Sequence, residues 1–244
     1  MSHMAVLFKR EFVSYFATPL AYVFIVIFLM LSGSFTFFFG GFFVNGQADL
    51  QVFFNYHPWL YLFLVPALSM RLWAEERKTG TLELLMTLPI SLRDLVLGKF
   101  LAAWVFTGIA LMLTFPIWIT VNYLGDPDNG AIVTGYIGSW LMAGGLLAIG
   151  SCISACNKNQ VIAFILSVVV SLLFLVTGMR IVMDWLPGWM SDGVIQSVAA
   201  LSFLSHFTSF AKGVLDFRDL LFFAIFIAGW LMATAIVIEM KKAD

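Results

Sequence analysis

The sequence predicts an all-α membrane protein that forms one transmembrane domain over residues 1–244. Hydrophobic residues make up 61% of the chain and charged residues 11%, and the mean hydropathy is +0.98. Soluble domains average about 45 to 50% apolar and about 25% charged residues. The apolar residues also lie in separate blocks that are long enough to cross a bilayer. None of the intervening segments has the size or composition of a soluble domain.

Six blocks are predicted to be transmembrane helices. A helix needs about 20 apolar residues, with a rise of about 1.5 Å each, to cross a hydrocarbon core of about 30 Å. The predicted spans cover 18–40, 52–72, 95–121, 131–155, 160–183 and 219–240. The second span is the most interrupted, because it contains Asn55, His57, Pro58 and Pro66. The first four residues, 1–4, resemble a cloning remnant.

The Lys and Arg residues are distributed unevenly between the two sides of these spans. If the N-terminus is cytoplasmic, ten of the 13 fall on the cytoplasmic side, and only Arg180, Lys212 and Arg218 fall outside. Positive residues near span ends favour the cytoplasmic face. With six spans, this bias predicts that both termini are cytoplasmic.

Residues 5–17 are predicted to form a short amphipathic helix in the cytoplasmic interface, because aromatic residues recur there at helical spacing. The residues predicted for this interface helix are Phe8, Lys9, Arg10, Phe12 and Phe16. A helix of this kind would lie along the membrane surface and lead into the first span. The alternative is a frayed basic tail that only orients that span.

Eight of the 27 charged residues lie between Trp73 and Phe100. A charge at mid-bilayer costs about 2.5 to 3.5 kcal/mol on insertion scales, so this stretch is predicted to lie in water or at the interface. A two-turn helix is predicted over 81–88, with Gly80 as its N-cap and Pro89 as its stop. The loop over 73–94 thus presents a short helix between two charged hinges, and a capping box at 91–94 opens the third span.

Leu82, Leu85 and Met86 form one apolar face of this short helix, with Leu84 and Leu88 beside it. Exposed apolar surface of this kind predicts docking on a partner protein. The alternative is a helix that lies on lipid headgroups. The chain has no G-x-x-x-x-G-K-[ST] phosphate-binding loop and no Lys, Arg, Asp or Glu well inside a predicted span. Energy from ATP would therefore have to arrive through a partner on the cytoplasmic face.

Other functional classes find little support in the residues. The chain has no H-E-x-x-H or G-x-S-x-G motif, and His57 and His206 stand apart from any metal-binding pattern. With a net charge of −1, the chain has no excess of basic residues that would indicate nucleic-acid binding. Residues 184–217 are too polar to span the membrane and are expected to form re-entrant or surface-lying helices on the outer face.

Three stretches resemble ABC-2 type permeases, particularly those of the gliding-motility-associated subfamily. The first, PALSMRLWAEERKTGTLELLMTLPISLRDLVLGKFLAAW, resembles the region between the second and third spans of that family. FKREFVSYFATPLAYV resembles the N-terminal interface helix, and LSHFTSFAKGVLDFRD resembles the segment before the last span. All three occur in the family's order, and the resemblance covers essentially the whole chain.

The resemblance implies six helices per subunit, two permease subunits around a central path, and two cytoplasmic ATPases in a bacterial inner membrane. The helix over 81–88 would be a coupling helix seated in a groove of the ATPase. By that resemblance the ATPase-coupling residues are Glu75, Glu76, Arg77, Gly80, Thr81, Leu82, Glu83, Leu84, Leu85, Met86, Leu88 and Pro89. The outer segment would be formed around His206, Phe207, Phe210, Gly213 and Asp216.

The chain itself is expected to hold no cofactor, with ATP and Mg on the partner ATPase. The second permease subunit could be identical or different, and an auxiliary membrane or periplasmic subunit could join the complex. Such complexes can export a substrate or do mechanical work on a periplasmic partner, and the sequence does not choose between them. The rival interpretations are a passive channel or scaffold whose charged loop binds headgroups, and an intramembrane enzyme.

Overall fold

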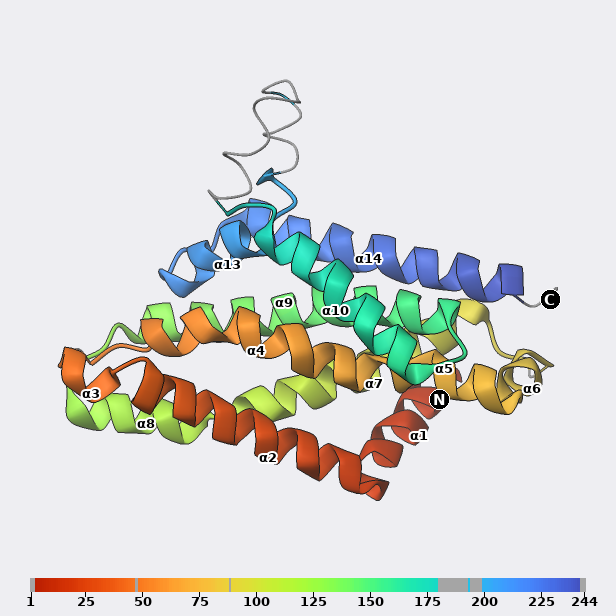
Figure 1. Cartoon of the computed structure of the whole chain (residues 1–244), viewed down its shortest axis with the longest axis horizontal. Coiled ribbons are helices and arrows are strands. Elements are labelled where there is room, and N and C mark those ends of the chain that lie inside the picture. The colour runs from red at the N-terminus through yellow and green to blue at the C-terminus, as the bar shows by residue number, and fades with distance from the viewer. Residues whose placement is uncertain (1–2, 47, 88, 180–192, 194–198, 242–244) are drawn as a thin grey trace.

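A computed structural model describes residues 3–46, 48–87, 89–179, 193 and 199–241 of the chain. Every regular element within these residues is a helix. The long helices lie side by side along the longest axis of the molecule (Figure 1). Helices α1 (His3–Ala17), α5 (Arg71–Thr79) and α6 (Thr81–Thr87) lie at one end of this bundle, together with the C-terminal end of α14 (Phe217–Met240). We call this the inner end and the opposite end the outer end.

The remaining helices complete the bundle and its outer end. They are α2 (Pro19–Ser34), the π-helical turn η1 (Phe35–Phe39), α3 (Phe42–Asn45), α4 (Gln51–Ser69), α7 (Leu92–Met112), α8 (Phe115–Leu124), α9 (Asn129–Cys156), α10 (Gln160–Val176) and α13 (Phe203–Ala211). Helices α3 and α13 lie toward the outer end (Figure 1). Several helices begin at a side-chain cap, among them α9, where the Asp128 carboxylate accepts hydrogen bonds from two backbone amides.

Four segments of the described chain are long and apolar enough to cross a membrane: Ala21–Val44, Leu92–Leu124, Asn129–Cys156 and Phe217–Met240. Helix α10 is apolar but has only 17 residues, and α4 has 19 residues with two internal prolines. Both helices lie along the bundle, where the second and fifth spans are predicted (Figure 1). Residues 180–183 of the predicted fifth span lie outside the described residues. A multi-pass membrane protein follows from the helices, and the count of six spans stays a prediction.

The predicted third span is two helices, α7 and α8, that meet at Leu113 and Thr114. Pro116 follows this break and has no amide hydrogen to donate to the preceding turn. The Thr114 hydroxyl lies 2.6 Å from the Leu111 carbonyl oxygen and 2.8 Å from the Tyr136 hydroxyl of α9. The break is thus held by polar contacts within the bundle.

Helix α9 forms the centre of the bundle and is buried along most of its length. Its glycines leave room for aromatic rings from other helices. A Cβ atom at Gly138 would lie 2.5 Å from the Phe210 Cβ of α13, and one at Gly144 would lie 2.7 Å from the Trp104 indole nitrogen of α7. Small residues in transmembrane helices allow such close approach. Aromatic packing on glycine therefore fixes where α7 and α13 contact α9.

Candidate functional site

The charged stretch after α4 forms a helical hairpin, α5 and α6, at the inner end of the bundle. The sequence predicts a loop with charged hinges, whereas Glu75, Glu76 and Arg77 all lie within α5. Gly80 has a left-handed φ of 73° and ends α5, so it caps the preceding helix as well as leading into α6. Its conformation is one that other residues adopt only with strain. The prediction of Gly80 as an N-cap missed this role.

The junction between α4 and α5 is completed by a serine from α9. The Ser154 hydroxyl donates to the Met70 carbonyl oxygen at 2.9 Å and accepts from the backbone amides of Trp73 and Ala74, each at 3.1 Å. In a continuous helix the Ala74 amide would donate to the Met70 carbonyl directly. Ser154 is therefore inserted into the helical hydrogen-bond ladder, which is a recognised cause of a helix kink.

Two further contacts fasten α5 to the same part of α9. The Trp73 side chain is fully buried, and its indole nitrogen donates to the Ser151 hydroxyl at 2.9 Å. About one turn later along α5, the Arg77 guanidinium donates to the Ala155 carbonyl oxygen at 2.7 Å. Together with Ser154, these contacts bind the first two turns of α5 to the inner end of α9. Helix α5 is thus a fixed extension of the bundle.

A buried ion cluster joins α5 to α7 and α1. The Lys99 ammonium of α7 lies 2.6 Å from a Glu76 carboxylate oxygen and 3.2 Å from one of Glu11 in α1. Only 5% of the Lys99 side chain is exposed, against 17% for each glutamate. The ammonium also lies 5.3 Å from the centroid of the Trp73 ring, within cation–π range. One cation thus serves two carboxylates from two different helices.

The two carboxylates differ in their pKa because one ammonium cannot neutralise both fully. Burial raises the pKa of Glu76 above its ordinary value, and the attraction of Lys99 only partly offsets this. Burial would also raise the pKa of Glu11, but Lys99 and the adjacent Arg10 guanidinium together lower it below the ordinary value. The second Glu76 carboxylate oxygen, Oε2, is buried and has no hydrogen-bond donor among the described residues. Glu76 is therefore the less stabilised of the two charges.

Helix α6 turns most of its predicted apolar face toward the chain's own core. Leu82 is buried, and Leu85 and Met86 are half-buried against that core. The sequence assigned this face to a partner, and the structure differs because a short helix gains most by packing on the domain that carries it. Leu84 is the apolar residue left exposed, at 69%. Thr81, Glu83 and Pro89 are also exposed, and Leu88 lies outside the described residues.

The predicted interface helix α1 crosses α7 near its start. A Cβ atom at Gly98 would lie 3.1 Å from the Leu7 Cβ, so α1 approaches α7 closely there. Phe12 and Phe16 pack partly on the core, and the Phe8 ring stacks on Phe12. Lys9 and Arg10 are exposed on the other side. The amphipathic character expected of this helix is present.

The outer residues lie on α13 and its connection to α14. Phe207 and Phe210 are buried, Gly213 has a left-handed φ of 86°, and the Asp216 carboxylate caps the start of α14. One ring nitrogen of His206 lies 2.6 Å from an Asp219 carboxylate oxygen, and the other lies 2.9 Å from the Ala200 carbonyl oxygen. Of the predicted outer segment 184–217, only residue 193 and residues 199–217 are described.

Sequence reasoning did not find Glu11, Lys99, Ser151 and Ser154 as parts of the inner site. The one signal in the sequence is a lysine in the second turn of a predicted span. A charge at that position needs a partner, so it could have indicated a buried ion pair. The serines resemble ordinary packing residues, and their role appears only when α5 lies beside them.

Comparison with known proteins supports the resemblance at family level. The sequence profile of the family described as ABC-2 family transporter protein matches residues 5–238. A 70-residue stretch, 28% of this chain, is 37% identical to heme exporter protein B of Rhodobacter capsulatus and covers 32% of that protein. The family profile matches nearly the full length, so this chain belongs to the ABC-2 family of transporter membrane proteins.

Proposed function

We propose that this chain is the permease subunit of a bacterial ABC transporter and that α5 and α6 receive force from a separate ATPase on the cytoplasmic face. Membership of the ABC-2 family supports a permease role, and the excess of Lys and Arg on this side supports a cytoplasmic inner end. The observation that carries the proposal is the contrast within the hairpin. α5 is bonded to α9 and α7, whereas α6 ends the hairpin with Leu84 exposed.

This arrangement suits force transmission. A push on α6 would pass into α5, because Gly80 joins the two helices without an intervening loop. From α5 it would reach α9 through Ser154 and Arg77, and α7 through Lys99. Directional hydrogen bonds and ion pairs resist sliding of one helix along another. The bundle would therefore move with the hairpin.

The complex we propose has two permease subunits and two ATPases, with ATP and Mg bound by the ATPases. The second permease subunit is either a copy of this chain or a related one. Leu84 would enter an apolar groove of the ATPase, and the exposed charge of Glu83 would set register and partner choice. Export and mechanical work on a periplasmic partner are both compatible with this route. The short match to a heme exporter names one candidate cargo, heme, for testing.

The test is the substitution Leu84→Asp, assayed by co-purification with the ATPase encoded beside the native gene and by stimulation of its ATP hydrolysis. Burying a leucine side chain contributes about 1.5 to 3 kcal/mol, so we expect binding to weaken by about tenfold or more. Leu215→Asp is the matched control, because Leu215 is 52% exposed in the connection between α13 and α14 at the other end. Co-purification and stimulation equal to those of the unsubstituted chain would refute the proposed role of α6 and favour a passive scaffold.

A further inference from the structure

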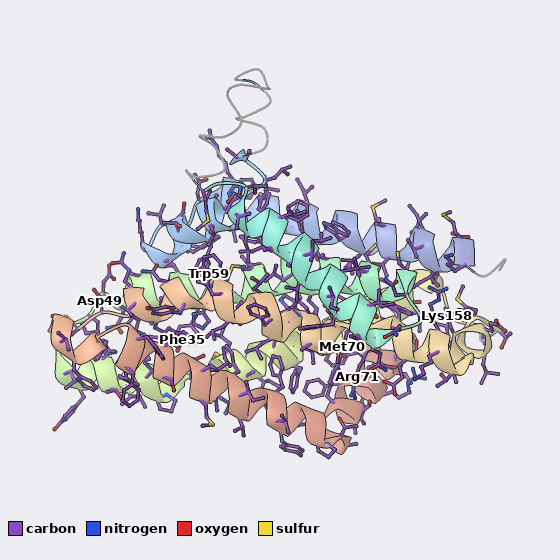
Figure 2. The ribbon with its side chains drawn as sticks, in the orientation of Figure 1. Phe35, Asp49, Trp59, Met70, Arg71 and Lys158 are labelled. Atoms are coloured by element: carbon purple, nitrogen blue, oxygen red, sulfur yellow. The ribbon has the colours of Figure 1, made fainter. Side chains whose placement is uncertain are left out.

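A cavity of about 440 Å³, with several charged residues in its walls, lies between α1 and α5 at the inner end of the bundle. The walls come from α1, from α5 and from Lys99 of α7, and Thr18 closes the side at which α2 begins. Figure 2 shows Arg71, one of its lining residues, at this end of the bundle, with Asp49 at the opposite end. The cavity therefore opens where the first span starts and where α4 has just ended. In a membrane protein this is the level of the lipid headgroups.

The charges that line the cavity are only partly neutralised by one another. Arg10 pairs with Glu11, and Lys99 pairs with Glu11 and Glu76. Arg71 and Glu75 also line the cavity and are one turn apart on α5, yet neither side chain forms an ion pair or hydrogen bond within the described part of the chain. The cavity thus presents an unpaired cation and an unpaired anion.

A second observation points to a missing hydrogen-bond donor. Glu76 lines the same cavity, and in the part of the chain that the structure describes its Oε2 atom has no donor although it is withdrawn from solvent. A buried carboxylate oxygen without a donor loses hydration that nothing replaces. A ligand that brings an ammonium group to Glu75 and, after a small rotation of the carboxylate, to Glu76 would supply the missing hydrogen bonds.

We propose that this cavity binds the headgroup of a zwitterionic membrane phospholipid with a primary ammonium, of the phosphatidylethanolamine type. The phosphate would pair with the Arg71 guanidinium, whose planar donors suit phosphate oxygens. The primary ammonium has three N–H donors for the carboxylates of α5, whereas the quaternary ammonium of phosphatidylcholine has none. An anionic headgroup without an ammonium would leave the carboxylates unpaired and repelled.

A membrane lipid fits better than a soluble amine phosphate because of what surrounds the opening. α1 presents aromatic residues as an interface helix does, and α2 begins directly after Thr18. The first exposed residues of α2 are apolar, including Tyr22, Val23 and Val26. Acyl chains could lie along that surface while the headgroup occupies the cavity. This inference does not rest on ATPase docking, because it concerns the permease alone.

The experiment measures lipid binding to the purified full-length chain in detergent by native mass spectrometry, with dioleoyl phosphatidylethanolamine, its N-methylated series and phosphatidylcholine as probes. We expect the unmethylated lipid to bind about tenfold more tightly than phosphatidylcholine, a difference typical of losing one charge-assisted hydrogen bond. The preference should fall stepwise as methyl groups replace the donors. Equal binding across the series would overturn the proposal.

Two exposed substitutions separate the phosphate from the ammonium contact. Arg71→Gln should weaken binding of every lipid in the series by a similar factor of about tenfold. Glu75→Gln should reduce the preference for the primary ammonium and leave binding of phosphatidylcholine unchanged. Arg93→Gln and Glu83→Gln are the matched controls, since both residues are exposed on the inner side but do not line the cavity. Controls that behave like the cavity variants, or cavity variants that behave like the unsubstituted chain, would contradict the assignment.

Discussion

Both ends of the bundle fasten a short helix to α9, but they use different interactions. At the inner end, α5 is bound to α9 by hydrogen bonds that Ser151 and Ser154 accept from it, and to α7 by the ion pair of Glu76 with Lys99. At the outer end, α13 buries Phe203 and Phe210 on the glycines of α9, with one hydrogen bond from Thr134 to the Phe210 carbonyl. Polar contacts have directions and fixed partners, whereas packing on small residues depends mainly on shape.

This difference matters for how each end can respond to force. A helix fixed by directional bonds keeps its register until those bonds break. A helix packed through rings on glycines resists separation but has few bonds that oppose a small shift along α9. We propose that force enters at the inner end, where directional bonds fix the position of α5 along α9. The largest effects of single polar substitutions should therefore occur at that end.

Replacing Lys99 with Met should produce the largest loss of stability. The substitution keeps an apolar stem of similar length but leaves the Glu11 and Glu76 carboxylates buried without their shared ammonium. Removing one partner from a buried ion pair costs about 3 to 5 kcal/mol. Thermal unfolding of the purified protein in detergent measures this as a lower midpoint. Lys212→Met at the outer end is the control, because Lys212 is exposed, and it should leave the midpoint unchanged.

If both lysine substitutions change the midpoint equally, the contrast between the two ends is wrong. The double substitution Lys99→Met with Glu76→Gln sharpens the test. It removes the less stabilised carboxylate together with the cation, so it should recover part of the stability lost in Lys99→Met.

Replacing Ser154 with Ala should have a smaller effect. The alanine leaves the Met70 carbonyl and the Trp73 and Ala74 amides without the hydroxyl that joins them. We expect a loss of about 2 kcal/mol, since each buried group left unpaired costs about 1 to 3 kcal/mol and the kink can partly relax. The same thermal measurement applies.

Ser167→Ala is the matched control for this change. Ser167 is a fully buried serine of α10 whose hydroxyl has no hydrogen-bond partner within the described ranges. Its loss should therefore be neutral or slightly stabilising. A loss of stability at Ser167 that equals the loss at Ser154 would show that the serine contacts at the α5 junction have no special role.

The sequence was sufficient to locate the short inner helix but not the contacts that hold it. Pro89 and the Ser91 cap mark the end of α6 and the start of α7, because proline and capping residues act locally. Glu11 and Lys99 are 88 positions apart, and their pairing depends on how α1 crosses α7. Contacts of that kind follow from tertiary packing and leave no local pattern.

The apolar face of α6 shows a second limit. Leu82, Leu85 and Met86 have the spacing of a docking face, and spacing cannot distinguish a partner's groove from the chain's own core. In the structure this face packs against the chain's own core, and Leu84 on the other side is exposed. The same holds toward the outer end, where glycines of α9 allow another helix to approach closely but do not specify which ring packs on each glycine.

The pH dependence of stability should give the smallest effect, because the two glutamates of the ion cluster shift in opposite directions. The pKa of Glu76 is raised above its ordinary value of 4.5, so ionising Glu76 costs more in the folded protein than in the unfolded chain. Its contribution to stability falls as the pH rises from 4.5 through the raised pKa. The pKa of Glu11 is lowered, so its contribution grows with pH up to the ordinary value and is lost as the pH falls through the lowered pKa.

Glu76→Gln and Glu11→Gln separate the two opposing terms, with thermal midpoints measured from acidic to neutral pH. Relative to the unsubstituted protein, Glu76→Gln should become more stable as the pH rises above 4.5, because it no longer carries the costly charge. Glu11→Gln should become relatively less stable as the pH rises toward 4.5, because it lacks a charge that Lys99 and Arg10 stabilise. Parallel pH profiles for the two variants would mean that Lys99 stabilises both carboxylates equally. Glu76 would then not be the less stabilised of the two, and the proposal that it can accept a further hydrogen-bond donor would fail.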